Sequence, residues 1–431
     1  MSPSQQATTL LANRPFVLLL AGRTTSMLGM AFSPVALAFG LLQLPDGGPA
    51  TLSIVLAAQT VPMVVFVLVG GVVADRYPRR LVLLTGELLA ALGWGAIGVM
   101  LLSGYAPILL LSLAAALAGM SSALIYPALS GIIPDLVSDD MLQPANSWLA
   151  MGASVARLAG LVAAGAVVVW LGGGWAMITA GSLFALAGLL MLRLPKLTGT
   201  LAGAEDHPIR QLVEGWGEFK SRQWLWVCVV QWSMLILAMQ AAHGVLGPVV
   251  AEQELGGAAA WTTILAGEAV GAMIGVAISL AWHPHRPILV GTLLTGTSAL
   301  PPILLAVSAP LWMVVGAMAL QGIGFELFGV LWLTTMQSEV PPEALSRVAS
   351  YDALGSLMLG PIGLLLAGPA TLAFGVHLPL LATGLLAFAT MSFALAFPEV
   401  RRLRSRLAPA IADDTASLPS GPLTTDPLIA D

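Results

Sequence analysis

Six ionisable side chains stand inside long apolar stretches of this sequence, where the surrounding residues carry no comparable chemistry. They are three carboxylates, one imidazole and two guanidinium groups: Glu87, Glu268, Glu326, His243, Arg23 and Arg157. Ionisable groups are costly inside a bilayer and usually have a function there. A carboxylate or an imidazole in such surroundings can exchange protons near neutral pH, and a guanidinium can hold an anionic group. These residues therefore predict proton exchange and the binding of charged groups.

Glu326 is the first candidate for proton coupling, because it stands alone among apolar residues in the segment GIGFELFGVLW. A carboxylate in such a segment can load and release a proton during a transport cycle. The alternative is a structural ion pair between Glu326 and Arg23 or Arg157. We favour the transport role, and the ion pair stays open.

Three further candidates for proton coupling each have a structural alternative. Glu268 could act as a proton gate or contact a substrate, and a structural role explains it equally well. Glu87 follows a charged loop and could instead brace the loop arginines or Arg157. His243 has a side chain suited to proton exchange, but a lone histidine is more often a hydrogen-bonded packing residue.

The two arginines could contact a substrate or form charge pairs. Arg157 falls near the middle of an apolar stretch, whereas Arg23 lies closer to one end, from which its side chain could reach the surface. Asp352 is expected to be an anchor at a helix end. Residue type alone suggests that five more side chains line a substrate cavity: Gln59, Gln240, Trp232, Phe325 and Trp332.

The composition places these residues in a membrane protein. The 431 residues are 58% hydrophobic and 9% charged, with a mean hydropathy of +0.91, whereas soluble domains have about 25% charged residues. The net charge of −5 argues against a nucleic-acid partner. Cys228 is the single cysteine, which excludes a disulfide framework and a cysteine-based metal site. No P-loop, HExxH or GxSxG motif is present, so we predict no enzyme activity, cofactor or metal.

Twelve apolar stretches approach or exceed the length of about 20 residues that a helix needs to cross a bilayer. They show no alternating barrel pattern, so we predict an all-α membrane protein. The predicted spans are residues 15–42, 52–73, 81–102, 107–132, 143–170, 175–193, 224–250, 261–281, 287–307, 310–334, 348–368 and 376–397.

The basic residues predict how these spans are oriented. Fifteen of the 17 Lys and Arg residues fall on one side of a twelve-span topology, and the other two are Arg23 and Arg157. The short loops of the opposite side carry Asp46, Glu252 and Glu254. Since cytoplasmic loops are enriched in Lys and Arg, both termini are predicted to be cytoplasmic. The abundance of Ala, Gly and Leu indicates a bacterial source, and therefore the bacterial cytoplasmic membrane.

The chain divides into two halves joined by a longer polar segment. We predict an N-terminal six-helix bundle over 1–194, a cytoplasmic linker over 195–222 and a C-terminal six-helix bundle over 223–400. Residues 401–431 are predicted to be a basic stretch followed by a disordered cytoplasmic tail.

A weak internal repeat with an offset of 203 residues supports this division. The segments ALAG (116–119) and ALQG (319–322) match across it. The repeat also pairs Gly152, Gly160 and Gly165 with Gly355, Gly363 and Gly368. It thus matches spans four and five with spans ten and eleven, and two such halves around a central site are a recurring plan of transporters.

The loop GVVADRYPRR (71–80) between the second and third spans has a charge pattern suited to a conformational latch. Asp75 can accept charge-assisted hydrogen bonds, and Arg79 and Arg80 can pair with acidic partners in one conformation only. Gly71 lets the end of its helix approach a neighbour closely. The alternative is that Arg76, Arg79 and Arg80 only anchor the loop at the cytoplasmic surface.

The full pattern, Gly71-x-x-x-Asp75-Arg76-x-x-Arg79-Arg80 after the second of twelve spans, resembles the signature loop of the major facilitator superfamily. The resemblance extends through span number, linker and repeat to about residue 400. It implies two pseudo-symmetric six-helix bundles around a central cavity, and transport by alternation between inward-facing and outward-facing states. The corresponding second-half loop, HPHRPI (283–288), keeps little of the pattern.

Residues 14–42 and the segment RLAGLVAAG (157–165) resemble the exporter branch that contains drug:proton antiporters and siderophore exporters. GPIG (360–363) resembles an antiporter-type helix motif. Met30 and Leu161 depart from the acidic residue and the proline that this branch often has there.

The resemblance implies proton-coupled efflux of a hydrophobic or amphipathic small molecule, such as a drug, an antibiotic or a secreted natural product. We expect a monomer in the lipid bilayer whose partners are this small molecule and protons. A siderophore exporter and an uptake transporter of the same fold stay open as alternatives, and a transporter-like sensor is the last of them.

Overall fold

The computed structural model describes residues 3–45, 47–133, 136–138, 141–195, 216–217, 219–282, 284–341, 348, 351–352 and 354–404. In these ranges the chain forms twelve helical spans that are long and apolar enough to cross a membrane. The predicted all-α membrane fold is therefore confirmed. Most of the predicted linker and nearly all of the predicted tail lie outside the described residues.

The N-terminal bundle begins with the short helix α1 (Pro3–Ala12). Its spanning helices are α2 (Arg14–Leu42), α3 (Pro49–Arg76), α4 (Arg79–Ser103), α5 (Ile108–Ile132), α6 (Leu142–Leu171) and α7 (Gly173–Leu192).

The C-terminal bundle has more interrupted helices. Its seventh span comprises α9 (Gln223–Ala241), the π-helical turn η2 (Ala242–Leu246), α10 (Gly247–Val250) and the π-helical turn η3 (Ala251–Leu255). The next two are α11 (Ala258–Ala281) and the broken span α12 (Pro287–Thr295), η4 (Gly296–Ala299) and α13 (Leu300–Ala306). The last three are α14 (Leu311–Glu339), the span Leu354–Phe374 that contains α16 (Gly360–Phe374), and α17 (His377–Ala396), followed by the short α18 (Pro398–Arg402).

The eleventh span differs most from its prediction, which ended it at residue 368. The helix instead continues through Gly368 and Pro369 to Phe374. Proline removes a backbone donor and usually ends a helix in water. In a membrane protein, neighbouring helices and local adjustments compensate for the lost hydrogen bond, so a helix can pass through a proline.

Local sequence explains where several helices begin and turn. The Asn13 side chain caps α2 by accepting a hydrogen bond from the Phe16 backbone N–H at 3.3 Å. Three of the short turns between spans use Gly104, Gly172 and Gly375, with φ values of 70°, 89° and 73°. A side chain would strain the backbone in this left-handed region, which explains glycine at these turns.

The two ends of the helical assembly differ in charge. We call the end that carries the following arginines the basic end: Arg14, Arg79, Arg193, Arg222, Arg286 and Arg401. The other end, where the glycine turns lie, is called the opposite end. Alternate spans run in opposite directions, so all six arginines reach one end.

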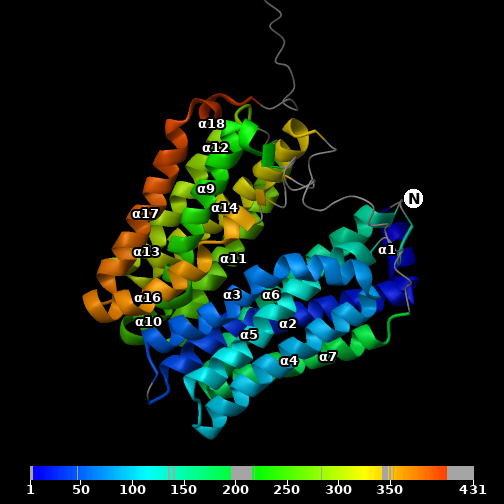
Figure 1. The fold of residues 1–431 in the computed structure, drawn as a ribbon, viewed down its shortest axis with the longest axis horizontal. Helices are drawn as coiled ribbons and strands as arrows, with labels where there is room; N and C mark the ends of the chain where they lie inside the picture. The colour runs from blue at the N-terminus through cyan, green and yellow to red at the C-terminus, as the bar shows by residue number, and fades with distance from the viewer. Residues whose placement is uncertain are drawn as a thin grey trace, which may run out of the picture.

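The two bundles share one hydrophobic core at the opposite end and have separate cores at the basic end. The shared core joins Phe32, Leu52 and Phe184 of the first bundle to Trp261 and Leu364 of the second. At the basic end, one core lies within the N-terminal bundle and another within the C-terminal bundle. Figure 1 shows the bundles meeting near α3, α10 and α16 and diverging toward α1 and α18. The protein is therefore closed at the opposite end and opened at the basic end.

Two glycines lie where the bundles approach each other closely. A Cβ atom on Gly165 of α6 would lie 2.5 Å from the Thr262 Oγ1 of α11, and one on Gly368 of α16 would lie 2.8 Å from the Ala50 Cα of α3. Gly165 and Gly368 are also partners in the internal repeat. Because a side chain would not fit at either position, these glycines allow the bundles to close at the opposite end.

Candidate functional site

A cavity of about 410 Å³ lies in the C-terminal bundle, between α9, α14 and the eleventh span. It is lined by Cys228, Trp232, Phe325, Glu326, Phe328, Gly329, Trp332, Asp352, Ser356 and Leu357. Helix α9 starts and α14 ends at the basic end, so the cavity extends from the middle of these helices toward that end. We call it the acidic cavity because it contains two carboxylates.

Four aromatic side chains form a continuous array along the acidic cavity. The rings of Trp232 and Phe328 are stacked with centroids 4.9 Å apart, and those of Phe328 and Trp332 are stacked at 5.9 Å. Phe325 packs against Trp232 at 5.3 Å. The three aromatics of α14 are spaced by three and four residues, which places them on one helix face.

The two carboxylates of the acidic cavity are held differently. Asp352 accepts a hydrogen bond from the Trp332 Nε1 at 3.1 Å and another from the Ser356 Oγ at 3.2 Å. Glu326 makes no hydrogen bond within the part of the chain that the structure describes; its Cβ packs near Gly275 of α11. Asp352 is thus fixed in direction, while the carboxyl group of Glu326 can reorient.

The lining of the acidic cavity includes some of the residues suggested by the sequence. Trp232, Phe325 and Trp332, three of the five side chains suggested for a substrate cavity, line it together with Glu326. Gln59 instead lines a small cavity in the N-terminal bundle. Asp352 is expected from the sequence to be an anchor at a helix end. The structure also places it in the acidic cavity. The sequence contains an indication of a polar site here, because Asp352 and Ser356 lie one helical turn apart at the start of an apolar span.

Glu87 and Arg23 lie in the N-terminal bundle, on α4 and α2. The Glu87 side chain is only 2% exposed, and it interacts with the Ser26 side chain and electrostatically with Arg23. A polar cavity of about 40 Å³ is lined by Arg23, Ser26, Ser121 and Gln59, among others. Glu87 therefore interacts with Arg23, a partner that was not among those suggested by the sequence, which were the loop arginines and Arg157.

His243 and Glu268 lie in the C-terminal bundle, outside the acidic cavity. His243 belongs to the π-helical turn η2, and its ring meets the Trp261 ring edge-on at 6.5 Å. Glu268 of α11 lies within electrostatic reach of His243. The four predicted proton-coupling candidates are thus divided among three places, and only Glu326 lines the acidic cavity.

Arg157 is exposed on the face of α6 that turns toward the C-terminal bundle. Leu161 and Ala164 follow it at i+4 and i+7 on the same face, and both are buried in the shared core with Ile264 of α11. Arg157 lies one turn nearer the basic end, where this face is uncovered. Arg157 does not line the acidic cavity. The structure also shows no ion pair between Arg157 and Glu326.

The predicted latch loop is described only in part. The surroundings of Gly71 and the side chains of Asp75 and Arg76 are not described by the structure. Arg79 and Arg80 are half-buried at the start of α4, and the Arg80 Nε is buried without a hydrogen-bond partner among the described residues. The latch stays a prediction.

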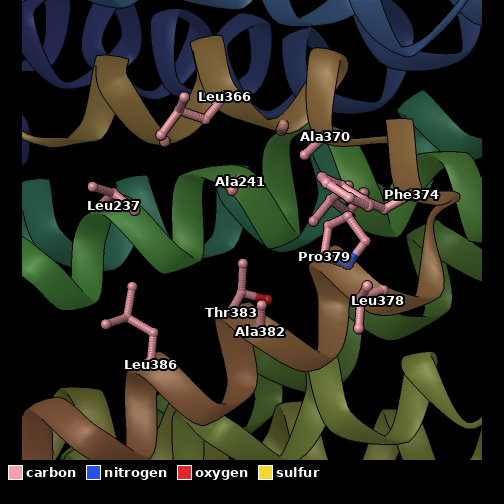
Figure 2. A pocket seen from close by; sticks show the side chains of 13 residues that line it. Leu237, Ala241, Leu366, Ala370, Phe374, Leu378, Pro379, Ala382, Thr383 and Leu386 are labelled. Carbon is pink, nitrogen blue, oxygen red and sulfur yellow. The ribbon is translucent and has the colours of Figure 1, made fainter. Parts of the chain in front are cut away.

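An apolar groove of about 380 Å³ runs between α9, α16 and α17. Figure 2 shows Leu237 and Ala241 at its base, Leu366 and Phe374 on the α16 side, and the α17 residues opposite. Several of its side chains are exposed, including Leu366 at 57% and Phe374 at 67%. In a membrane protein, such a surface faces hydrocarbon, and this groove offers no charged group for proton exchange or ion binding.

No group of three His, Cys, Asp or Glu side chains among the described residues could hold a metal ion. The acidic cavity presents carboxylates and aromatic rings.

Comparison with known sequences gives the family context. The sequence model of the Major Facilitator Superfamily matches residues 16–352. The chain is 22% identical to Macrolide efflux protein A of Streptococcus pyogenes, covering 90% of this chain and 97% of that protein. It is 25% identical to Multidrug efflux pump Tap of Mycolicibacterium fortuitum over the same shares. It is 28% identical to Enterobactin exporter EntS of Escherichia coli, covering 82% and 85%.

Solved structures share the fold. The nucleoside transporter NupG matches with a TM-score of 0.69 and 14% identity, covering 88% of this chain and 98% of that one. A bacterial homolog of the human lysosomal transporter Spinster, in an inward-facing and unoccupied conformation, matches with a TM-score of 0.67 and 14% identity, covering 90% and 98%. At these identities the likeness shows the fold alone.

Proposed function

Since this chain belongs to the Major Facilitator Superfamily, we propose that it exports a hydrophobic or amphipathic small molecule in exchange for protons. The observation that carries this proposal is the acidic cavity, in which Glu326 and Asp352 lie beside an array of aromatic rings. Three relatives that match most of the chain are named as efflux proteins or exporters, which supports the direction of transport.

The orientation of the chain follows from its basic end. Lys and Arg residues near membrane helices mark the cytoplasmic side, so the basic end is cytoplasmic and both termini lie in the cytoplasm. The conformation that opens at the basic end is then inward-facing. The acidic cavity extends toward this end, from which a substrate in the cytoplasm or the inner leaflet can load.

Export requires the two bundles to alternate between closure at one end and closure at the other. In the proposed cycle, a proton from outside binds Glu326 and a substrate from inside displaces it, so the two compete for the same carboxylate. A proton and a substrate that cannot bind together are exchanged across the membrane. Arg76, Arg79 and Arg80 of the latch loop stabilise one of the two states.

The proposal predicts proton flux that depends on both substrate and Glu326. Inverted membrane vesicles with an imposed pH gradient are challenged with antibiotics, dyes and siderophores. A transported compound is expected to discharge the gradient with the wild type, while Glu326→Gln reduces this discharge to the level of vesicles without the protein. Gln keeps the size of the side chain but cannot exchange a proton.

The control is Glu252→Gln, which changes an exposed carboxylate at the opposite end and is expected to leave the flux unchanged. If no compound discharges the gradient but several bind the purified protein, proton-coupled export is wrong. Uptake, uniport or sensing would then explain the binding.

A siderophore is the second candidate substrate, because a relative is the Enterobactin exporter EntS and Arg157 is exposed on the face of α6 that turns toward the C-terminal bundle. A catecholate siderophore is anionic, and Arg157 could bind it. This candidate predicts that Arg157→Gln abolishes siderophore-driven proton flux in the same vesicles.

A further inference from the structure

Five exposed basic side chains gather at the basic end of the C-terminal bundle. They come from three segments that are far apart in the sequence: Lys220 before α9, Arg286 at the start of α12, and Arg401, Arg402 and Arg404 in and after α18. None of them forms an ion pair within the part of the chain that the structure describes. We call these five residues the cationic rim. On a chain whose net charge is −5, such a surface attracts anions.

The packing of α18 brings the three segments together. Helix α18 contacts both α9 and α12, and Figure 1 shows it beside α12 at one end of the C-terminal bundle. Val400 of α18 is fully buried in the same core as Ile288 of α12. The Phe397 ring, just before α18, meets the Trp226 ring of α9 edge-on at 5.5 Å. One side of α18 is thus held against the bundle, and its two arginines are exposed.

Glu399 fixes α18 to the start of α9. Its Oε2 accepts a hydrogen bond from the Trp224 backbone N–H at 3.0 Å. This N–H lies in the first turn of α9, where no intrahelical acceptor is available and a negative charge is favoured. Glu399 is the single acidic residue in the described segments 219–223, 284–288 and 397–404. Its carboxylate is bound to the end of α9, so the rim keeps its positive charge.

The surroundings of the rim favour a membrane lipid over a soluble anion. The spanning helices α9 and α12 begin at this level and α17 ends there, so the rim lies where lipid headgroups lie. Trp216 and Trp282 are 51% and 42% exposed, and each stands four residues before a rim cation. Tryptophan is enriched at the interface between membrane and water. A ligand with an anionic head and apolar chains can contact both the cations and these rings.

We propose that the cationic rim binds anionic phospholipids of the cytoplasmic leaflet through their phosphate groups. The inference uses the orientation given above and goes beyond export, because lipid binding needs neither a substrate nor a proton. Guanidinium groups match the geometry of phosphate oxygens. Each Lys or Arg near an anionic membrane surface contributes about 1 kcal/mol, which corresponds to about fivefold in affinity.

The test measures the preference of the protein for an anionic lipid. The full chain is reconstituted in phosphatidylcholine vesicles that contain a trace of spin-labelled phosphatidylglycerol or spin-labelled phosphatidylcholine. Electron paramagnetic resonance gives the fraction of each labelled lipid that the protein immobilises. We expect phosphatidylglycerol to associate about tenfold more strongly than phosphatidylcholine.

Two double variants with equal loss of charge distinguish a built site from general attraction. Arg401→Gln combined with Arg402→Gln is expected to reduce the preference by about fivefold or more, while Lys at both positions should retain most of it. The matched control combines Arg14→Gln with Arg193→Gln, since both residues are exposed at the same end of the N-terminal bundle. This control should keep the preference.

Glu399→Ala provides a test with opposite expected signs. It removes a negative charge beside the rim, so charge alone would strengthen the binding of phosphatidylglycerol. It also removes the hydrogen bond that fixes α18 to α9. We expect the preference to fall, because Arg401 and Arg402 then lose their fixed place beside Arg286.

Equal losses in the two double variants, or stronger binding in Glu399→Ala, would overturn the inference in favour of general attraction to a basic end. Sodium phosphate is also compared with sodium chloride at the same ionic strength. It should leave the preference unchanged, whereas displacement of the labelled lipid would identify a soluble anion as the ligand. No substrate or pH gradient is present, so the result is independent of the flux assay.

Discussion

Replacing Gly165 or Gly368 by valine is expected to abolish transport while the protein still folds and inserts. Each added side chain would collide with the other bundle, at Thr262 for Gly165 and at Ser53 and Ala50 for Gly368. Overpacking of this kind costs about 1–3 kcal/mol, which changes the ratio of two states by about 5-fold to 150-fold. The cost falls on the state that is closed at the opposite end, so the variants should remain open there.

The change of state can be measured as a distance between the bundles. Tyr105→Cys and Val307→Cys place spin labels at exposed positions of the opposite end, one on each bundle. The single native cysteine, Cys228, is buried, which limits background labelling. The distance between the labels is expected to increase in the Gly165→Val and Gly368→Val variants, together with loss of substrate-dependent flux.

Gly316→Val in α14 is the matched control, because a Cβ atom there would have no neighbour within 4 Å. It should transport normally and keep the wild-type distance. Normal transport by both interface variants would show that these glycines do not control closure at the opposite end.

Replacing Arg23 by leucine is expected to lower the free energy of unfolding by about 1 kcal/mol, because the half-buried Arg23 interacts electrostatically with the buried Glu87 carboxylate. Glu87 is almost completely buried, and its Oε2 has no hydrogen-bond partner among the described residues. Without Arg23, the ionised carboxylate would have no opposite charge to compensate its burial. The loss should be smaller at acidic pH, because protonation makes Glu87 neutral.

A double-mutant cycle separates the charge pair from general packing. Thermal unfolding followed by tryptophan fluorescence is compared for Arg23→Leu, Glu87→Leu and the double variant. The double variant should be more stable than Arg23→Leu, since no uncompensated charge remains. Additive losses would show that Arg23 and Glu87 act independently.

If Glu87→Gln removes proton flux without lowering stability, Glu87 is a proton carrier rather than the structural partner of Arg23.

The sequence by itself determined the class of the protein and the number of its spans. Helices that cross a bilayer must satisfy their backbone hydrogen bonds locally, so their length and apolar composition are visible in a short window of sequence. The repeat that pairs Gly165 with Gly368 could also be read directly from the chain, as could the resemblance carried by residues 71–80.

Only the tertiary structure decided which ionisable groups meet. Glu87 interacts with Arg23, Glu268 lies within electrostatic reach of His243, and Glu326 shares a cavity with Asp352. Glu326 and Asp352 lie on different helices. Their approach depends on how those helices are rotated and packed, which a nearly uniform apolar sequence does not specify. The positions of Gly165 and Gly368 between the bundles were hidden for the same reason, since small residues serve equally well within a bundle and between two of them.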